Sequence, residues 1–340
     1  MSPLDALAAL DAAAFGTGLS PQNARACWAA ALEGAQQVPL DRELQGEPPR
    51  CVTIVASANV FTAPIEWAWA LSARGVRVIL KSARGLAPVG EAVAAALPGV
   101  EHRAWRGGEL AAEAAALAES SAAIVFGGAE TIAAIRQRSP VPVLGFGPRF
   151  GVAMLEQLGA VEAADVALDH ALYDGRGCMS PAGVFVRGEV NLAAVAEAMA
   201  AAERGLPVGE VSGAEAGALR ALELLARVEG RVVKGEGWLV VELPIHRFAP
   251  RGLPRVVVIH RGDVSDVSAA LAPWRGELGT VAVGGAGAVG GRTGELTSPL
   301  GGTERVCWVG EMQRPRGDRV LHDGVDVLGV LWGVGARPHE

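Results

Sequence analysis

One cysteine of this sequence stands where nucleophilic chemistry would need it. Cys178 lies in the stretch YDGRGCMSPAGVFV (173–186), and the apolar end of that stretch reads as a strand. Glycines at 175 and 177 allow backbone amides to come close to the sulfur, where a developing oxyanion would need hydrogen-bond donors. The same letters also fit a small buried cysteine beside a tight turn, since free cysteines are usually core residues. The local sequence alone favours this second interpretation, so the nucleophile hypothesis depends on the rest of the chain.

Three further candidates come at the ends of expected strands. Apolar, β-branched runs alternate with helix-like stretches of about ten residues, which predicts a doubly wound parallel sheet. The expected strands are 51–56, 77–81, 100–105, 123–126 and 141–144. Asn59, Lys81 and Gly127 follow three of them, and such sheets bind ligands beyond the carboxyl ends of their strands. Lys81 and Gly127 also fit an ordinary strand-end charge and an ordinary βα turn.

The pattern changes after residue 145 and indicates a second α/β unit. Helices are expected at 151–158, 191–203, 213–228 and 264–272. Strand-like runs are found at 183–186, 231–243, 255–261, 279–285, 305–312 and 326–332. We therefore predict a first domain, 1–145, on which the tail 318–340 could pack, and a second domain, 146–317, which carries Cys178.

Composition argues against several other classes of protein. The 340-residue chain has a net charge of −7 and no basic cluster, which disfavours nucleic acid as a partner. No apolar run approaches the roughly 20 residues of a membrane span, and the N-terminus lacks the basic leader of a secretory signal. The cysteines at 27, 51, 178 and 307 form no CxxC pair, and the six histidines have no metal-ligand spacing. We therefore expect a cytoplasmic protein with neither a disulfide framework nor a metal site.

Two familiar motifs do not fit their usual functions. The segment 284–291, GGAGAVGG, contains GxGxxG after a strand-like run. The residues that follow it, GRTGELTSPLGG, cannot begin the helix that a dinucleotide fingerprint requires, so we expect a loop. Hydrolysis by a Ser/His/Asp triad is disfavoured because the GxSxG elbow is missing.

Four stretches together resemble one group of enzymes. In chain order they are VASANVFTAPIEWAWALSARGVRVILKSARG, VFGGAETIAAIRQR followed by GFGPRFG, DGRGCMSPAGVFV, and GEMQRPRGDRVLHDG. From about Cys51 to Trp332 the chain resembles the aldehyde dehydrogenase superfamily, specifically the acyl-CoA reductase branch typified by the fatty-acyl reductase of bacterial bioluminescence (LuxC type). The resemblance implies an aldehyde dehydrogenase-like α/β fold, with a doubly wound domain that binds a nicotinamide dinucleotide and a second α/β catalytic domain. It also implies a homo-oligomer.

The resemblance gives individual residues a role. Cys178 matches the family nucleophile, and Asn59 matches the asparagine whose amide helps to hold the thioester oxygen. Lys81, with Ser82 beside it, matches the lysine that holds the adenosine ribose or its phosphate. The turn and helix start beneath the pyrophosphate are matched by Gly127, Gly128 and Glu130.

Arg84 predicts the choice of cofactor. In members that prefer NAD, a glutamate three residues after the lysine accepts a hydrogen bond from the ribose 2′-hydroxyl. Arg84 stands at that position, and a cation there could pair with a 2′-phosphate, so we predict NADPH rather than NADH. The alternative is that the Arg84 side chain points into solvent.

A missing carboxylate predicts the direction of the reaction. Hydrolytic relatives carry a general-base glutamate in a stretch matched here by Leu144–Pro148, LGFGP, which has none. Without that base an acyl-enzyme is poorly placed for hydrolysis and is more readily reduced. We therefore predict NADPH-dependent reduction of a thioester of coenzyme A or acyl carrier protein to an aldehyde, through a covalent thioester on Cys178.

The proton donor and two alternative functions stay open. His260 and His322 are candidates for the acid, although a structural role is favoured for His322 with Asp323 and Gly324. The first alternative is another aldehyde or semialdehyde dehydrogenase that uses the same cysteine. The second is a non-catalytic relative that serves as a binding partner.

Overall fold

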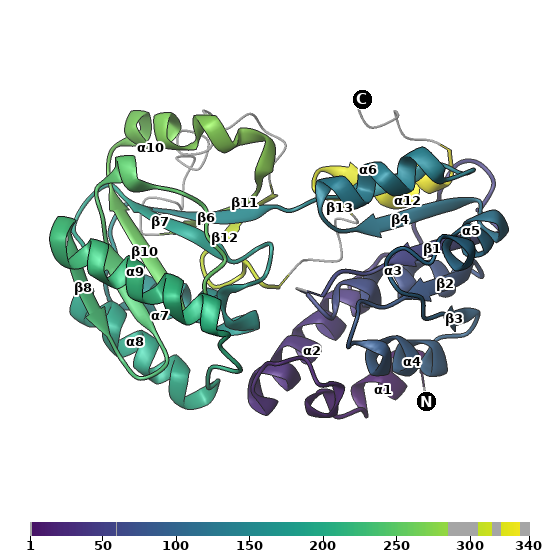
Figure 1. Cartoon of the computed structure of the whole chain (residues 1–340), viewed down its shortest axis with the longest axis horizontal. Helices are drawn as coiled ribbons and strands as arrows, with labels where there is room; N and C mark the ends of the chain where they lie inside the picture. Colours follow the sequence, from purple (N-terminus) through teal and green to yellow (C-terminus); the bar gives the residue numbers. More distant parts are fainter. Residues whose placement is uncertain (1, 59, 285–304, 315–320, 334–340) are drawn as a thin grey trace. The chain divides into compact units, whose positions relative to one another are not determined.

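The chain forms two compact units (Figure 1). The structure is a computed structural model that describes residues 2–58, 60–284, 305–314 and 321–333. The first unit takes the described residues up to Thr17, from Cys27 to Pro148, and from Arg314 onward. The second unit takes Gly18–Ala26 and the described part of Arg149–Gln313.

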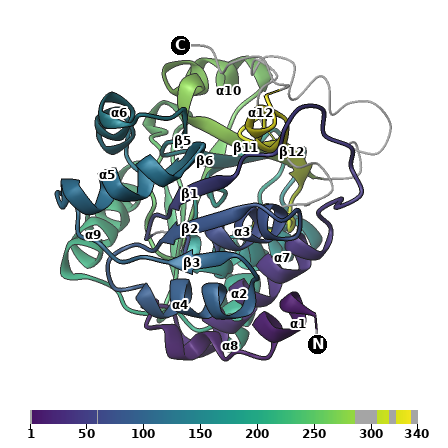
Figure 2. The same cartoon turned by 90° about the vertical axis from the view of Figure 1, so that its right-hand side faces the viewer.

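A five-stranded parallel sheet with the order β3-β2-β1-β4-β5 forms the centre of the first unit. Its strands are β1 (Cys51–Val55), β2 (Arg77–Lys81), β3 (Val100–His102), β4 (Ala122–Phe126) and β5 (Val143–Phe146). Every residue of β1 and β4 is buried, as expected for central strands covered on both faces. Figure 2 shows β1, β2 and β3 side by side. The strand order reverses between β1 and β4, where doubly wound sheets bind their ligands.

Helices connect these strands, and the predicted doubly wound sheet is confirmed. They are α3 (Ala63–Ser72), α4 (Ala87–Ala96), α5 (Leu110–Glu119) and α6 (Ala129–Arg138). Leu117 of α5 and Ile132 and Ile135 of α6 pack against Val55 and Val125 in one buried cluster. Helices α5 and α6 therefore cover the same face of the sheet.

The other elements of the N-terminal region are α1 (Pro3–Ala8), the 3-10 turn η1 (Ala12–Phe15) and α2 (Pro21–Gln36). A hairpin of β13 (Leu321–His322) and β14 (Val325–Asp326) leads to helix α12 (Val327–Leu331). None of the helices in the described part of the chain is both long and apolar enough to cross a bilayer.

The predicted strand at 326–332 is wrong, because most of this stretch is α12. Asp326 caps the helix: its carboxylate accepts a hydrogen bond from the Gly329 N–H at 2.9 Å. A short apolar run has no periodicity that separates a strand from a buried helical turn. The cap, a polar residue just before the run, was the available signal.

A seven-stranded sheet with the order β12-β11-β6-β7-β10-β9-β8 forms the centre of the second unit. Its strands are β6 (Phe150–Leu155), β7 (Pro181–Val186), β8 (Arg231–Lys234), β9 (Leu239–Glu242), β10 (Val256–Arg261), β11 (Leu278–Gly284) and β12 (Arg305–Trp308). The β8–β9 pair at one edge is antiparallel, and the other ladders are parallel.

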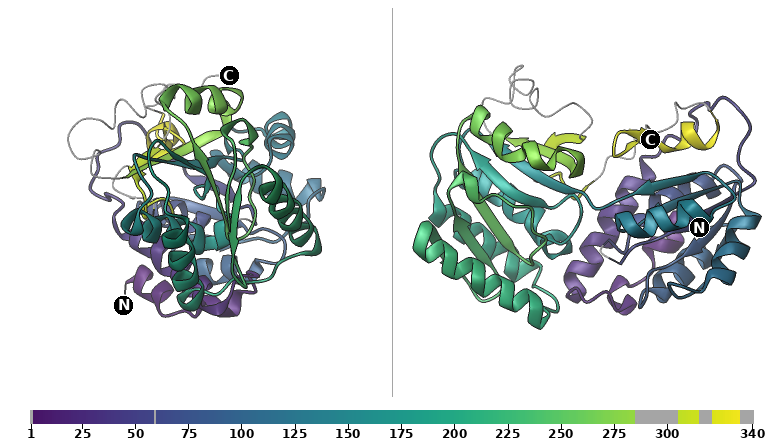
Figure 3. Two further views of the ribbon diagram at one scale, coloured as in Figure 1. Left: turned by 90° about the vertical axis from the view of Figure 1, so that its left-hand side faces the viewer. Right: turned by 45° about the horizontal axis from the view of Figure 1, so that its top comes forward.

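Helices pack on both faces of this second sheet (Figure 3). They are α7 (Ala160–Ala171), α8 (Leu192–Gly205), α9 (Gly213–Glu229) and α10 (Val264–Leu271), with 3-10 turns η2 (Leu172–Gly175), η3 (Ile245–Arg247) and η4 (Ala272–Glu277). Met199 of α8 packs in one cluster with Val184 of β7. Leu271 of α10 packs in another with the next residue, Phe185, and neighbouring strand residues point to opposite faces.

The predicted helix at 151–158 is also wrong: residues 150–155 form β6, in the middle of the sheet. All six residues of β6 are buried. A strand covered on both faces reads as a continuous apolar run, which periodicity cannot separate from a buried helix, and alanine, methionine and leucine favour the helical reading. Residues 285–291 of the expected glycine-rich loop lie outside the described residues.

Candidate active site

A left-handed turn leads into Cys178. Tyr173, Asp174 and Gly175 have φ angles of 54°, 54° and 71°, three consecutive residues in the left-handed region. That conformation is strained for residues with a side chain and persists only when its surroundings hold it. The chain then reaches Cys178 and enters β7 three residues later. The backbone before the cysteine is therefore set by contacts further away in the sequence.

Asp174 supplies those contacts from a fully buried position. Its carboxylate accepts hydrogen bonds from Asn23 Nδ2 at 2.8 Å, and from Arg255 Nε, Arg176 Nη1 and the Gly209 N–H at 3.0 Å each. The Arg255 N–H also donates to the Asp174 carbonyl at 3.0 Å. Both Asp174 and Arg255 have exposures of 0%. The four donors satisfy the buried carboxylate and tie the turn to distant segments.

Gln313 holds the chain on the other side of Cys178. Its Nε2 donates to Ser180 Oγ at 2.6 Å, and both residues are buried. A methyl group on Gly177 would lie 3.1 Å from Gln313 Oε1 and 3.3 Å from Ser180 Oγ. The glycine before the cysteine therefore leaves little space between its backbone and this pair. Cys178 lies in a short segment held at both ends.

Asp169 fixes the segment that carries Gln313. Its buried carboxylate accepts from the Gly310 N–H at 2.7 Å and the Met312 N–H at 3.0 Å. Burial raises the pKa of Asp169 to about 7, against the opposite effect of these two amides. The neighbouring His170 is also buried, and desolvation lowers its pKa to about 4.

Cys178 is partly exposed, unlike two of the other three cysteines of the chain. Cys27 and Cys51 are buried, with exposures of 0% and 2%, whereas Cys178 and Cys307 are partly exposed. Burial raises the pKa of the Cys51 thiol, which suits an inert core residue. Cys178 is thus not enclosed in a core, which the structural interpretation of its sequence would require.

The two histidine candidates lie in packed surroundings. His260 is fully buried beside Phe185 and Phe248, and its Nδ1–H donates to the Leu243 carbonyl at 3.0 Å. Desolvation lowers the pKa of His260. These contacts are those of a core residue.

His322 packs beside the rings of Trp67, Phe126 and Phe146. It opens a two-residue turn in which Asp323 and Gly324 have φ angles of 49° and 76°. Positive φ at both positions is typical of a tight hairpin, and the Asp-Gly pair suits it. The His322 ring lies 4.4 Å from that of Phe146 between ring centroids.

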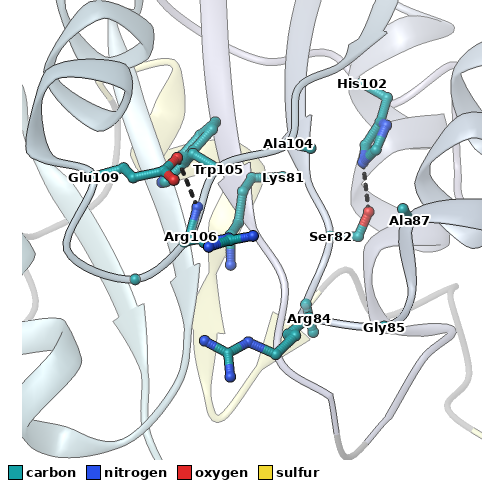
Figure 4. Close-up of a pocket in the computed structure, with 12 residues that line it drawn as sticks. Lys81, Ser82, Arg84, Gly85, Ala87, His102, Ala104, Trp105, Arg106 and Glu109 are labelled. Atoms are coloured by element: carbon teal, nitrogen blue, oxygen red, sulfur yellow. Dashed lines mark hydrogen bonds between the residues drawn. The ribbon is translucent and has the colours of Figure 1, made fainter.

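Three of the predicted cofactor residues line one pocket of the first unit (Figure 4). Lys81 ends β2, and Ser82 and Arg84 follow it, so the predicted positions fall on the carboxyl edge of the sheet. The pocket has a volume of about 640 Å³ and is closed on its other side by the segment after β3, which includes Trp105 and Arg106. Burial and the nearby Arg84 lower the pKa of Lys81.

Ser82 is positioned by His102 within this pocket. Ser82 Oγ and His102 Nε2 lie 2.6 Å apart, and burial lowers the pKa of His102. A methyl group on Gly90 would lie 2.3 Å from both His102 Cδ2 and Ser82 Oγ. Helix α4 therefore packs directly against this pair, and only a glycine allows that approach.

Gly127, Gly128 and Glu130 lie where β4 ends and α6 begins. Gly128 is the N-cap of α6 and provides no side-chain cap for the first amides of the helix. A methyl group on Gly128 would meet nothing within 4 Å, so packing inside the protein does not require a glycine there. The exposed helix start instead leaves space for a ligand to approach its amides.

Two further predicted features of the first unit have different outcomes. Asn59 lies outside the described residues. The carboxylate-free stretch Leu144–Pro148 falls largely on β5. There, a methyl group on Gly145 would lie 2.3 Å from Ile132 Cγ2 of α6. The stretch therefore lacks the carboxylate and also, at position 145, the space for one.

A family model described as acyl-CoA reductase (LuxC) matches residues 96–332, which include the Cys178 segment, both of its anchors and Gly127–Glu130. The chain belongs to the acyl-CoA reductase (LuxC) family. The resemblance inferred from the sequence is thereby confirmed. No match was found among curated protein sequences.

Proteins of known structure show that this LuxC-family chain has the aldehyde dehydrogenase-like fold. Methylmalonate-semialdehyde dehydrogenase (DddC) from Oceanimonas doudoroffii is 12% identical, with a TM-score of 0.68 over 92% of this chain and 77% of that chain. NADP-dependent glyceraldehyde-3-phosphate dehydrogenase from Bacillus halodurans, in complex with NADP, is 15% identical, with a TM-score of 0.63 over 89% and 77%. Proline utilization A from Bradyrhizobium japonicum is 17% identical, with a TM-score of 0.61 over 91% of this chain, which spans only 38% of it.

Sequence reasoning missed several residues of the LuxC-family site. Asp174 and Arg255 are 81 positions apart, and no local pattern connects them. Gln313 lies within a stretch that carried the resemblance, but nothing in that stretch pairs it with Ser180. Arg106 had a usable signal: a cation and an aromatic residue before two glycines, directly after an expected strand.

Proposed function

We propose that this protein reduces acyl thioesters to aldehydes with NADPH, through a covalent acyl intermediate on Cys178. Membership of the acyl-CoA reductase (LuxC) family supports the reaction class. The observation that carries the assignment is the placement of Cys178, partly exposed and directly after a left-handed turn fixed by the buried Asp174. Strain held in place by buried charge is a common feature of functional sites.

The first half of the reaction is acyl transfer to sulfur. The Cys178 thiolate attacks the thioester carbonyl, the tetrahedral oxyanion collapses, and the carrier thiolate of coenzyme A or acyl carrier protein leaves. Backbone N–H groups of the glycine-containing loop, together with Asn59, stabilise the oxyanion. In comparable sites, each such donor lowers the activation free energy by about 3–4 kcal/mol.

The second half of the reaction regenerates the Cys178 thiolate. NADPH supplies a hydride to the carbonyl carbon of the enzyme thioester. The loop donors hold the resulting oxyanion until its collapse expels the Cys178 thiolate and releases the aldehyde. The oxidised product is NADP+, and the carrier thiolate released in the first half takes up a proton. The turn anchored by Asp174 keeps the sulfur in one place through both steps.

The pocket after β2 fits the adenosine end of the cofactor. Lys81 and Arg84 line it with Ser82, and cations there suit a dinucleotide that carries an additional phosphate. The α6 start at Gly127, Gly128 and Glu130 lies one strand beyond β1 in the sheet order, and its amides suit the pyrophosphate. We assign these residues to NADPH.

The structure of the Leu144–Pro148 stretch favours reduction over hydrolysis. Its residues carry no carboxylate, and Ile132 fills the space beside Gly145. An acyl-enzyme without a base to activate water survives until the hydride arrives. Aldehyde, rather than carboxylic acid, is therefore the expected product.

A direct test follows NADPH consumption with a panel of acyl-CoA thioesters and looks for the acyl adduct by mass spectrometry. Cys178→Ala should remove both turnover and the adduct while NADPH still binds. Cys307→Ala is the matched control, because Cys307 is also partly exposed and lies in the same unit, and it should retain both. Turnover by Cys178→Ala, or an adduct that maps to Cys307, would refute the assignment.

A further inference from the structure

Arg106 lines the same pocket as Lys81 and Arg84, although nothing in the resemblance assigns it a role (Figure 4). Strands β2 and β3 are neighbours, with Leu80 paired to His102, so the segments that follow them leave the same edge of the sheet. The first segment brings Lys81 and Arg84, and the second brings Arg106. Three cations from two loops therefore face one space.

The protein balances the charge of this group only in part, since Glu113 is near enough to Lys81 to raise its pKa against the larger effect of burial. Lys81, Arg84 and Arg106 form no ion pair with any residue that the structure describes. Glu109 also lines the pocket, but its carboxylate accepts a hydrogen bond from the Arg106 backbone N–H at 3.0 Å. That contact fixes the loop and leaves the guanidinium directed elsewhere.

A nearby arginine shows what a purely structural cation looks like here. Arg103 lies three residues before Arg106 and forms ion pairs with Glu101 at 2.6 Å and Glu119 at 2.7 Å. Arg77 pairs with the same two carboxylates, at 2.8 Å and 2.9 Å. Arg77 and Arg103 thus have carboxylate partners, whereas none of the three cations of the pocket is in an ion pair with a described residue.

The pocket also offers contacts for an adenosine. Trp105 lines it while packing against buried residues such as Val55, Leu117 and Cys51, so its ring has a fixed place. Ser82 also lines the pocket, and its hydroxyl points toward His102, 2.6 Å from Nε2. Guanidinium groups present paired N–H donors that match the oxygens of a phosphate.

We propose that Arg106 and Arg84 together bind a phosphate group carried on the ribose of an adenosine ligand, and that Arg106 thereby determines specificity for phosphorylated ligands. The inference rests on the proposed function, in which NADPH is such a ligand and coenzyme A is a second where it is the acyl carrier. NADPH carries this phosphate on the 2′-oxygen, and coenzyme A carries it on the 3′-oxygen. Lys81 contributes its charge from the floor of the same pocket.

The test measures dissociation constants by calorimetry for two pairs of ligands, NADPH with NADH and coenzyme A with dephospho-coenzyme A. Arg106→Ala should weaken the phosphorylated member of at least one pair by about 10–100-fold, as for other hydrogen bonds to charged groups. Binding of the unphosphorylated member should change by no more than about twofold. The dissociation constants of Arg106→Lys should lie between those of the wild type and Arg106→Ala, because lysine keeps the charge but lacks the paired donors.

Arg103→Ala is the matched control, since it removes an arginine of the same loop that has carboxylate partners. It should leave all four dissociation constants unchanged. The pair that responds to Arg106→Ala identifies whether the phosphate belongs to NADPH or to coenzyme A. Equal weakening of both members of each pair, or no weakening, would overturn the inference. If the wild-type protein binds NADPH and reduces acyl thioesters, such a result leaves the proposed function standing; if it does neither, the proposed function itself fails.

Discussion

Ile132 occupies the space that any side chain at position 145 would need. Its Cγ2 atom lies 2.3 Å from the place of a methyl group on Gly145, well inside contact distance. Helix α6 and strand β5 therefore approach each other in a way that only glycine permits. The resemblance to hydrolytic dehydrogenases places their general-base glutamate in this stretch, so the close packing and the loss of the base belong together.

Gly145→Ala is expected to destabilise the protein by about 1–3 kcal/mol, the usual cost of overpacking a core. The methyl group cannot be accommodated by a flexible chain end, because Ile132 Cβ also lies only 3.4 Å away. Chemical denaturation measures the change. Gly147→Ala is the control, because its methyl group would meet only Ile132 Cδ1 at 3.9 Å and should have little effect.

The double variant Ile132→Ala with Gly145→Ala tests whether Ile132 causes the loss of stability expected for Gly145→Ala. Removal of the isoleucine side chain opens the space, so the cost of Gly145→Ala should largely disappear in that background. Strict additivity of the two single changes would show that Ile132 is not responsible.

Asp174→Ala should lower the free energy of unfolding by about 3–5 kcal/mol, because it leaves the buried Arg255 guanidinium without its anion. It should also slow alkylation of Cys178 by iodoacetamide, since the turn before the cysteine loses the contacts that hold it. Denaturation and alkylation rates measured on the same samples give both quantities.

The exposed pair Arg227–Glu223 provides the comparison for Asp174. Glu223→Ala should change stability by no more than about 1 kcal/mol, as is usual for surface ion pairs, and should leave the alkylation rate unchanged. A stable Asp174→Ala protein with normal alkylation would contradict a positioning role for this carboxylate.

Asp169 should make the protein less stable as the pH rises. Its pKa is about 7 in the folded chain, against 3.8 as the ordinary value, because burial disfavours the anion. The folded state therefore holds a proton that the unfolded chain has lost between about pH 4 and 7, and the stabilisation from that proton disappears across this window. Over the full window the loss is up to about 4 kcal/mol. Denaturation of Asp169→Asn across pH 4–8 should lack this slope, and an unchanged slope would count against the raised pKa.

His170 should have the opposite effect in an overlapping range. Its pKa is lowered to about 4 from 6.5 by burial, so the folded state keeps the ring neutral while the unfolded chain takes up a proton. Its contribution is complete above about pH 6.5 and is lost as the pH falls towards 4, by up to about 3 kcal/mol. His170→Asn, which can still donate to the Val166 carbonyl, should be less sensitive to acid than the wild type. A variant that is equally sensitive to acid would place the titrating group elsewhere.

The sequence was sufficient for the five-stranded sheet of the first unit because its signals are local. Strands of five apolar residues alternate with helices that begin near a proline or end at a glycine, as at Pro64 and Gly75, and chain direction then places Lys81 and Gly127 on one edge. Arg106 was missed although its segment has a usable signal, because only the folded chain reveals that it has no ion pair with the described residues and lines the same pocket as Lys81.

The second unit was harder to predict because its decisive contacts are distant. Strand β6 lies in the middle of a sheet, and its uniform apolarity erases the alternation that identifies a strand. The backbone of Asp174 adopts a conformation that its own sequence disfavours, and Arg255 and Asn23 stabilise it from far along the chain. Such a turn has no signature in the residues that form it.

The hydrogen bond from Asn23 to Asp174 has a consequence for the synthesis of the chain. These residues are 151 positions apart, so Asn23 is synthesised long before Asp174. This hydrogen bond cannot form until the segment that contains Asp174 has been translated, and closing so long a loop is slow. A translation product that stops before Asp174 therefore lacks the carboxylate that Asn23 contacts in the folded chain.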